Sequence, residues 1–226
     1  QYRDGGWVAR WSSPGYADLM VGTSSDVAFT DAWLKGVRGF DAHHAYEAAL
    51  KNATAVPPVS NVGRKGLAQS MYRGYADTSV HEGMSWTLEG ALNDFGLAQL
   101  AAALAGEEGD TARGRRYREE AAYFRARAAD YAHVYDPATR FFRGRDARGG
   151  WRVPAKQFDP RRWGGDYTEA NAWTFAFTVP HDAEGLASLM GGRHVLASRL
   201  DEFFATPETA EAKYSGSYRQ VIHEMT

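Results

Sequence analysis

Apolar side chains recur every three or four residues over most of this chain, the spacing that places them on one face of an α-helix. The clearest case follows Ser79-Val80-His81-Glu82, which has the residues of a capping box, and it predicts a helix that ends at Gly106. Its apolar stripe consists of Met84, Leu88, Ala91, Leu92, Phe95, Ala98 and Ala102. A second stripe predicts a partner helix over 111–135, and it consists of Tyr117, Ala121, Phe124, Ala128 and Tyr131. Two such helices joined by a few residues predict an antiparallel αα-hairpin in which Met84, Leu88 and Phe95 are buried.

Shorter elements are predicted on both sides of this hairpin. Before it, the pattern predicts helices over 25–36, 42–52 and 67–73. After it, helices are predicted over 169–178, with Thr168 as N-cap, over 183–190, with Asp182 as N-cap, and over 194–204. A final helix is predicted to begin at Ser217. The stretch 140–153 differs from these, because paired aromatic residues and a glycine-rich turn predict a short β-hairpin there.

Helical pairs in series predict an all-α fold, either a solenoid or a closed toroid. The composition agrees, because 37 alanines and a single isoleucine favour helix over sheet. No fixed sequence period is present, which disfavours a regular solenoid. Since the last predicted helix has no C-terminal signal, we expect the chain to be a piece of a larger domain.

Charge and cysteine content exclude several classes of function. The chain has 28 acidic and 26 basic residues and a formal net charge of −2, which argues against a nucleic-acid partner. It contains no run of about eighteen apolar residues, so we expect no membrane span. It contains no cysteine, which excludes disulfides, thiolate metal sites and cysteine nucleophiles within it.

The stretch 157–173 combines carboxylates with large aromatic side chains and a Gly-Gly pair, where a loop enters a predicted helix. Aromatic faces stack on sugar rings, and carboxylates bind hydroxyls or transfer protons, so a carbohydrate site is one interpretation. In that interpretation Glu169 lies near the N–H groups of the first helical turn, Trp163, Tyr167 and Trp173 shape the sugar site, and Asn171 holds a hydroxyl. The alternative is that Glu169 only complements the helix dipole and that Trp173 belongs to the core.

Other polar residues favour structural roles. Glu89 and Asp94 lie five residues apart on the long predicted helix, so they do not share a face, and each is expected to be solvated or structurally paired. The adjacent His43 and His44 point in different directions from a helix and are predicted to lie on the surface. Asp182 is predicted to cap the helix that follows it.

Six segments in order resemble landmarks of glycoside hydrolase family 92, the calcium-dependent α-mannosidases, and together they cover nearly the whole chain. They are Met20-Val21-Gly22 with Asp31-Ala32-Trp33-Leu34-Lys35-Gly36, then Arg73-Gly74-Tyr75, Ser85-Trp86-Thr87-Leu88-Glu89 with Asn93-Asp94, Phe158-Asp159-Pro160, Tyr167-Thr168-Glu169-Ala170-Asn171-Ala172-Trp173, and Val179-Pro180-His181-Asp182 leading to Gly191-Gly192.

The resemblance implies that residues 1–226 are the central part of a single (α/α)6 toroid, truncated at both ends and preceded in the family by a β-sandwich domain. It implies an exo-acting enzyme that removes terminal α-linked mannose, such as α-1,2-linked mannose, from N-glycans or mannans with inversion. Glu169 occupies the family's general-acid position. Calcium is the implied cofactor, and its ligands and the general base are expected outside this chain, so the isolated fragment is expected to be inactive. The implied location is secreted or at the cell surface, although no signal is visible here.

The chain departs from the family pattern beside the acid position. Ala170 replaces a glycine, and Thr174-Phe175 replaces the usual Gln-Tyr. To donate a proton, Glu169 is expected to be buried beside Trp163 or Trp173, where the neutral carboxyl is favoured. Two alternatives stay open at this point: another (α/α)6 glycosidase related to trehalases or glucoamylases, and a catalytically silent fragment that only binds carbohydrate.

Overall fold

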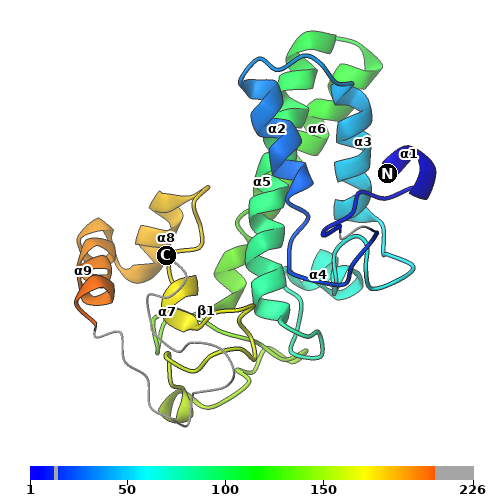
Figure 1. Ribbon diagram of the computed structural model, residues 1–226. Helices are drawn as coiled ribbons and strands as arrows, with labels where there is room; N and C mark the ends of the chain where they lie inside the picture. The colour runs from blue at the N-terminus through cyan, green and yellow to red at the C-terminus, as the bar shows by residue number, and fades with distance from the viewer. Residues whose placement is uncertain (13–14, 207–226) are drawn as a thin grey trace.

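The computed structural model describes residues 1–12 and 15–206, and most of them form helices arranged in pairs (Figure 1). Helices α2 (Ser25–Leu34) and α3 (Ala42–Thr54) form one pair, and α5 (Gly83–Glu108) and α6 (Ala112–Arg127) form a second. Helices α8 (Ala183–Met190) and α9 (Arg193–Ala205) form a third. The remaining elements are α1 (Tyr2–Gly5), α4 (Leu67–Arg73), η1 (Asp130–Val134), η2 (Ala155–Gln157), α7 (Ala172–Phe175) and the strands β1 (Tyr135–Asp136) and β2 (Phe141–Phe142). The helix predicted from Ser217 lies outside the described residues.

The first two pairs repeat with the same orientation. The backbone N–H of Thr23, just before α2, donates to Asn93 of α5, and the hydroxyl of Thr30 donates to the carbonyl of Gly96, so α2 and α5 run in the same direction. Asn52 near the end of α3 donates to Asp26 at the start of α2, which makes that pair antiparallel. Residues of α5 and α6 meet in opposite order, since Gln99 accepts from Arg125 and Glu108 from Arg113. This is the predicted paired-helix arrangement.

The apolar core lies between these pairs and continues around the small sheet. One cluster joins α3, α5 and α6 through Tyr46, Leu97, Leu100, Leu104, Tyr117 and Phe124. A second surrounds β2, α7 and α8 and includes Met84, Leu88, Phe142, Trp173 and Leu186. All five residues of the stripe predicted for the partner helix are buried, and so are Met84 and Leu88. Phe95, which was predicted to be largely buried, is partly buried.

Helix α5 begins at Gly83, so the predicted capping box at Ser79 is wrong. Both the hydroxyl and the backbone N–H of Ser79 donate to Asp77, which withdraws Ser79 from the helix. The N-cap is Glu82, whose φ of 56° lies in the left-handed region and whose side chain makes no capping bond. The helix also passes through Gly106 and ends at Glu108, before Gly109 with φ 61°.

The other boundaries differ where local side-chain bonds intervene. Helix α6 ends at Arg127, and the rest of the range predicted as helix up to 135 is largely the 3-10 turn η1. The strand pairing joins β1 to β2, earlier than the hairpin predicted over 140–153. Asp136 causes this shift, because its side chain accepts from Ala138 and Thr139 and closes the turn between the strands. Within the predicted range, an isolated bridge joins Arg145 and Trp151.

Three buried charged side chains and one partly buried arginine join the helical pairs to one another. Arg64, in the loop before α4, lies 3.1 Å from Asp26 of α2 and 2.6 Å from Asp94 of α5. Arg127, in the last turn of α6, lies 2.6 Å from the other oxygen of Asp94. All three of Arg64, Asp26 and Asp94 are at most 4% exposed. Since each charge has an opposite partner at hydrogen-bond distance, the network fixes α2, α5 and α6 relative to one another.

Removing Asp94 from this network leaves Arg127 without its carboxylate and Arg64 with Asp26 alone. Asp94→Ala in the full-length protein is expected to lower the free energy of unfolding by about 3–5 kcal/mol, because Arg64 and Arg127 both lose a carboxylate. The matched control is Asp110→Ala, whose carboxylate pairs with Arg115 and Arg118 but is 86% exposed, and which is expected to cost about 1 kcal/mol or less. Thermal or urea unfolding measures both, and equal effects would contradict the role given to Asp94.

Candidate active site

Helix α7 begins at Ala172 rather than at Glu169, so the candidate residues before it belong to a loop. The predicted N-cap, Thr168, makes no capping bond, and Asn171 takes that place: its side-chain oxygen accepts from the N–H groups of Trp173 (3.0 Å) and Thr174 (3.2 Å). Backbone bonds from Gly164 to Ala170 and from Ala172 to Pro160 close the loop over 160–172. The side-chain oxygen of Asn171 is therefore used by the protein itself.

Glu169 is exposed and lies in left-handed backbone, with a φ of 47°. This conformation costs a non-glycine residue roughly 1–2 kcal/mol, and such strain is concentrated at functional sites. The expected burial of Glu169 beside Trp163 or Trp173 is wrong, because Glu169 lies in the loop before α7 and is exposed. Among the described residues, Glu169 has no hydrogen-bond or ion-pair partner.

One buried hydroxyl ties this loop to α5. Ser85, which is fully buried two residues into the helix, donates to the carbonyl of Asp166 (2.8 Å) and accepts from the N–H of Thr168 (3.1 Å). These two bonds therefore hold the backbone immediately before Glu169, the residue that follows Thr168. Ser85 lies in one of the family landmarks, but no role is predicted for it, because a contact across more than eighty residues leaves no local signal in the sequence.

A cleft of about 330 Å³ opens on one side of the loop. Trp163 and Tyr167 line it, together with Phe158, Gln157 and Arg162. The hydroxyl of Tyr167 donates to the carbonyl of Phe142 (2.7 Å), which fixes its ring. Two predicted sugar-contacting aromatics are therefore brought together, while Trp173 is not among the lining residues.

Trp173 is a core residue. It is 6% exposed, and its ring meets Phe141 edge to face at a centroid distance of 5.0 Å. The guanidinium of Arg199 lies 4.3 Å from the ring centroid. These contacts match the alternative in which Trp173 packs the interior.

The other two carboxylates of the stretch are paired with arginine. Asp166 lies 2.6 Å from Arg152 and accepts from the N–H of Gly144 (2.9 Å), where a side chain on Gly144 would collide with the carboxylate. Asp159 lies 3.1 Å from Arg161. Of the three carboxylates in the predicted site, Glu169 is thus the one left available to a ligand.

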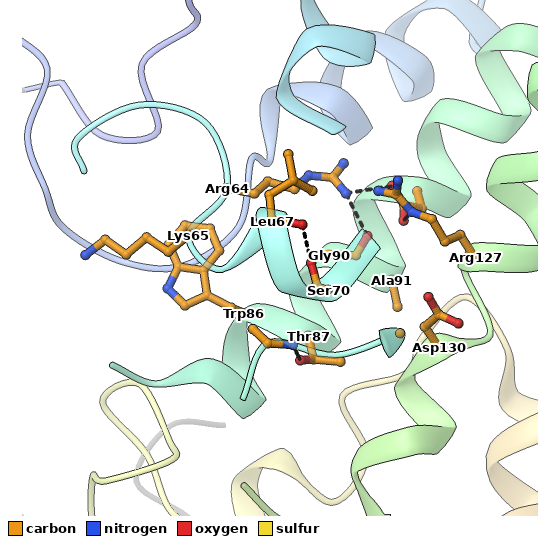
Figure 2. Close-up of a pocket in the computed structure, with 13 residues that line it drawn as sticks. Arg64, Lys65, Leu67, Ser70, Trp86, Thr87, Gly90, Ala91, Arg127 and Asp130 are labelled. Atoms are coloured by element: carbon orange, nitrogen blue, oxygen red, sulfur yellow. Dashed lines mark hydrogen bonds and ion pairs between the residues drawn. The ribbon is translucent and has the colours of Figure 1, made fainter. Parts of the chain in front are cut away.

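A second, smaller cavity lies beside the buried charge network, where Asp130 faces Arg127 (Figure 2). Burial raises the pKa of Asp130 to about 6, although His133 and Arg127 oppose the shift. The cavity measures about 40 Å³, which is room for water molecules and not for a sugar ring. It belongs to the framework of the fold.

The remaining candidates divide into confirmed and corrected predictions. Asp94 is structurally paired, as predicted, and Asp182 caps α8 by accepting from Gly185 (2.8 Å). Glu89 is neither fully solvated nor paired: it is partly buried, and no described residue bonds to its carboxyl. The Nδ1 of His43 lies 2.9 Å from the hydroxyl of Tyr117.

The described residues do not form a calcium site by themselves. Within 1–12 and 15–206, no group of three or more His, Asp or Glu side chains is placed to hold a metal ion together. We therefore assign no step to a metal. No helix in the described part of the chain is both long and apolar enough to cross a bilayer.

Comparisons with known proteins agree with this fold. Residues 1–224 match the family model for the catalytic domain of glycosyl hydrolase family 92. An uncharacterized secreted glycosidase of Arthroderma benhamiae is 26% identical over 216 residues, which cover 80% of this chain and 26% of the relative.

Two mannosidases of Bacteroides thetaiotaomicron have similar structures. A family GH92 inverting mannosidase superposes with a TM-score of 0.80 at 33% identity, covering 95% of this chain and 28% of the other. A family GH92 α-mannosidase, solved in complex with mannoimidazole, gives a TM-score of 0.69 at 29% identity, covering 85% and 24%. The likeness confirms the predicted all-α, partial (α/α)6 toroid, and this chain spans about a quarter of the length of these relatives.

The strained backbone at Glu169 has a measurable consequence. Glycine adopts positive φ without the steric penalty of a side chain. In the full-length protein, the free energy of unfolding is therefore expected to be about 1 kcal/mol higher for Glu169→Gly than for Glu169→Ala. The control pair is Glu119→Gly and Glu119→Ala, in the middle of α6, where the order reverses because glycine destabilises a helix by about 1 kcal/mol relative to alanine. Urea unfolding gives both differences, and the same order at both positions would show that Glu169 is not held in left-handed backbone.

Proposed function

Since this chain belongs to glycosyl hydrolase family 92, we propose that the protein it is part of is an exo-acting α-mannosidase, which hydrolyses terminal α-linked mannose of N-glycans or mannans with inversion. The observation that carries the proposal is Glu169, an exposed and unpaired carboxylate in strained backbone, in the same loop as Trp163 and Tyr167, which line the aromatic cleft. The mannosidase names of the similar structures support the sugar, and α-1,2-linked mannose is the proposed linkage.

Glu169 is proposed as the general acid that protonates the departing glycosidic oxygen. Its exposed carboxylate is free of internal partners, and the tie from Ser85 to Thr168 holds the backbone immediately before it. A bound substrate that excludes water would favour the protonated form that an acid needs.

The aromatic residues have different roles in this proposal. Trp163 and Tyr167 form an apolar wall against which a sugar ring packs. Trp173 and Asn171 hold the loop from the inside, through the core and the α7 cap. Direct contact of these two side chains with sugar, expected from the sequence, stays a prediction.

The remaining parts of the mechanism are proposed to come from outside the described residues. Inversion requires a general base whose carboxyl lies roughly 6.5–9.5 Å from that of the acid, with a water between them. The rest of the toroid is the proposed source of that base and of any calcium ligands, and a β-sandwich domain is the proposed neighbour. Secretion is proposed because the curated relative is described as a secreted glycosidase.

Substrate and metal dependence are tested together. The full-length protein is expected to hydrolyse an aryl α-mannoside and not the matching α-glucoside, and to lose activity with a chelator and regain it with Ca²⁺. Release of the aryl group measures each rate. Preferential cleavage of the glucoside would favour a trehalase- or glucoamylase-like enzyme, and cleavage of neither would favour the silent carbohydrate-binding alternative.

The acid role predicts a dependence on the leaving group. In the full-length protein, Glu169→Gln is expected to lower turnover of a natural mannoside by about 10² or more, which is a typical general-acid contribution. An aryl mannoside with a very acidic leaving group needs no protonation, so its turnover should fall much less. Steady-state kinetics on both substrates measures the ratio.

Glu184→Gln is the matched control, since Glu184 is exposed on α8 and pairs with Arg193. It should leave both rates unchanged. Equal slowing of both substrates by Glu169→Gln, or slowing of neither, would refute the acid assignment.

A further inference from the structure

Asp166 bonds through both its backbone and its side chain, and together these bonds fasten the loop over 160–172 to two other parts of the chain. Its carbonyl accepts from the hydroxyl of Ser85 in α5 (2.8 Å). Its carboxylate accepts from the backbone N–H of Gly144 (2.9 Å) and lies 2.6 Å from the guanidinium of Arg152. One residue therefore joins the loop both to the long helix and to the segment that follows β2.

The segment 144–152 holds this carboxylate in a fixed place. The backbone N–H of Arg152 donates to the carbonyl of Gly144 (2.9 Å), so the two partners of the carboxylate are themselves hydrogen-bonded to each other. A β-carbon on Gly144 would lie 2.2 Å from Oδ1 of Asp166 and 2.5 Å from its Cγ, so only glycine leaves room for the carboxyl group. The side chain of Asp166 is 11% exposed, and bonds to an ionised group are among the stronger hydrogen bonds of a protein.

Glu169, three residues later, has no side-chain contact of this kind in the described part of the chain, so the backbone on either side sets its position. Before it, the N–H of Thr168 donates to the hydroxyl of Ser85 (3.1 Å). After it, the carbonyl of Ala170 accepts from the N–H of Gly164 (2.9 Å). The φ of 47° at Glu169 lies between these two fixed points, and strained backbone persists only where its surroundings hold it.

We propose that Asp166 is a positioning residue, which holds the loop so that the carboxyl of Glu169 meets the glycosidic oxygen of a bound sugar. The proposal rests on the general-acid role proposed above and adds the residue that fixes the acid's geometry. Without the carboxylate of Asp166, the loop keeps its bonds to Ser85 but is released from Gly144 and Arg152. Glu169 can then leave its strained conformation, and a displacement of about 1 Å at a reacting group can cost about 10² in rate.

The test uses three single variants of the full-length protein. Asp166→Ala removes the carboxylate, and Gly144→Ala keeps it but displaces it by adding a methyl group at the point of contact. Asp182→Ala is the matched control. The carboxylate of Asp182 also accepts from one backbone N–H, that of Gly185 (2.8 Å), and from one side-chain donor, the hydroxyl of Tyr131 (2.6 Å), but it does so at the start of α8.

Asp166→Ala and Gly144→Ala are each expected to lower kcat for a natural mannoside by about tenfold or more. For an aryl mannoside with a very acidic leaving group, kcat should fall less than about threefold, because that group departs without a proton. KM should change less than about threefold, since the loss falls on proton donation. Asp182→Ala should keep the wild-type ratio of the two rates, although it should lower the melting temperature through the lost cap. Steady-state kinetics, referred to the folded fraction measured by circular dichroism, gives each value.

A double-mutant cycle separates positioning of the acid from a general loosening of the site. In the Glu169→Gln background the acid is already absent, so adding Asp166→Ala should lower kcat for the natural mannoside by less than about threefold more. If Asp166 supported the site without acting through Glu169, the two losses would multiply.

Other results would overturn the assignment. Equal slowing of both substrates by Asp166→Ala and Gly144→Ala, or losses that multiply in the cycle, would show that Asp166 only supports the fold. If Asp166→Ala does not fold, Asp166→Asn replaces it, since it keeps an oxygen for the N–H of Gly144 and loses the charge that faces Arg152; it should show the same dependence on the leaving group, at a smaller size. Leaving-group dependence in Glu169→Gln alone would contradict the role of Asp166, whereas its absence in Glu169→Gln would refute the acid and this inference together.

Discussion

The rest of this structure depends on the carboxylate of Asp94, which forms ion pairs with two arginines, Arg64 and Arg127. One oxygen of its carboxylate binds Arg64, which also reaches Asp26 of α2, and the other binds Arg127 of α6. A single buried carboxylate thereby joins both helical pairs. The start of α5 is where the candidate loop attaches, so the position of that loop follows from the packing that these charges fix.

The spacing of apolar residues predicted most of the helices and the antiparallel packing of α5 and α6. It could do so because the face of a helix that becomes buried is marked by residues close together in the sequence. Helix ends were predicted less well, since a cap depends on which neighbouring side chain reaches the free N–H groups. Ser79 and Thr168 had the residue types of N-caps, yet Asp77 binds the first and Asn171 replaces the second. Both competitors lie within three residues, so the choice is decided by backbone geometry rather than by residue type.

The sequence predicted which stretch contains the candidate site, but not how its side chains are arranged in space. Trp163 and Tyr167 line the cleft as expected, whereas Trp173 packs in the core and Glu169 is exposed. The difference comes from the closed loop over 160–172 and from Ser85, which are contacts between distant segments.

The central claim is that Glu169 protonates the glycosidic oxygen of a sugar bound at the loop over 160–172. A crystal structure of the full-length protein with a bound mannose or a mannose-like inhibitor tests it most directly. We predict that an oxygen or nitrogen of the ligand at the position of the glycosidic bond lies within about 3.2 Å of the Glu169 carboxylate, with the ring against Trp163 or Tyr167. A ligand bound at a well-ordered site away from the Glu169 carboxylate would contradict the account.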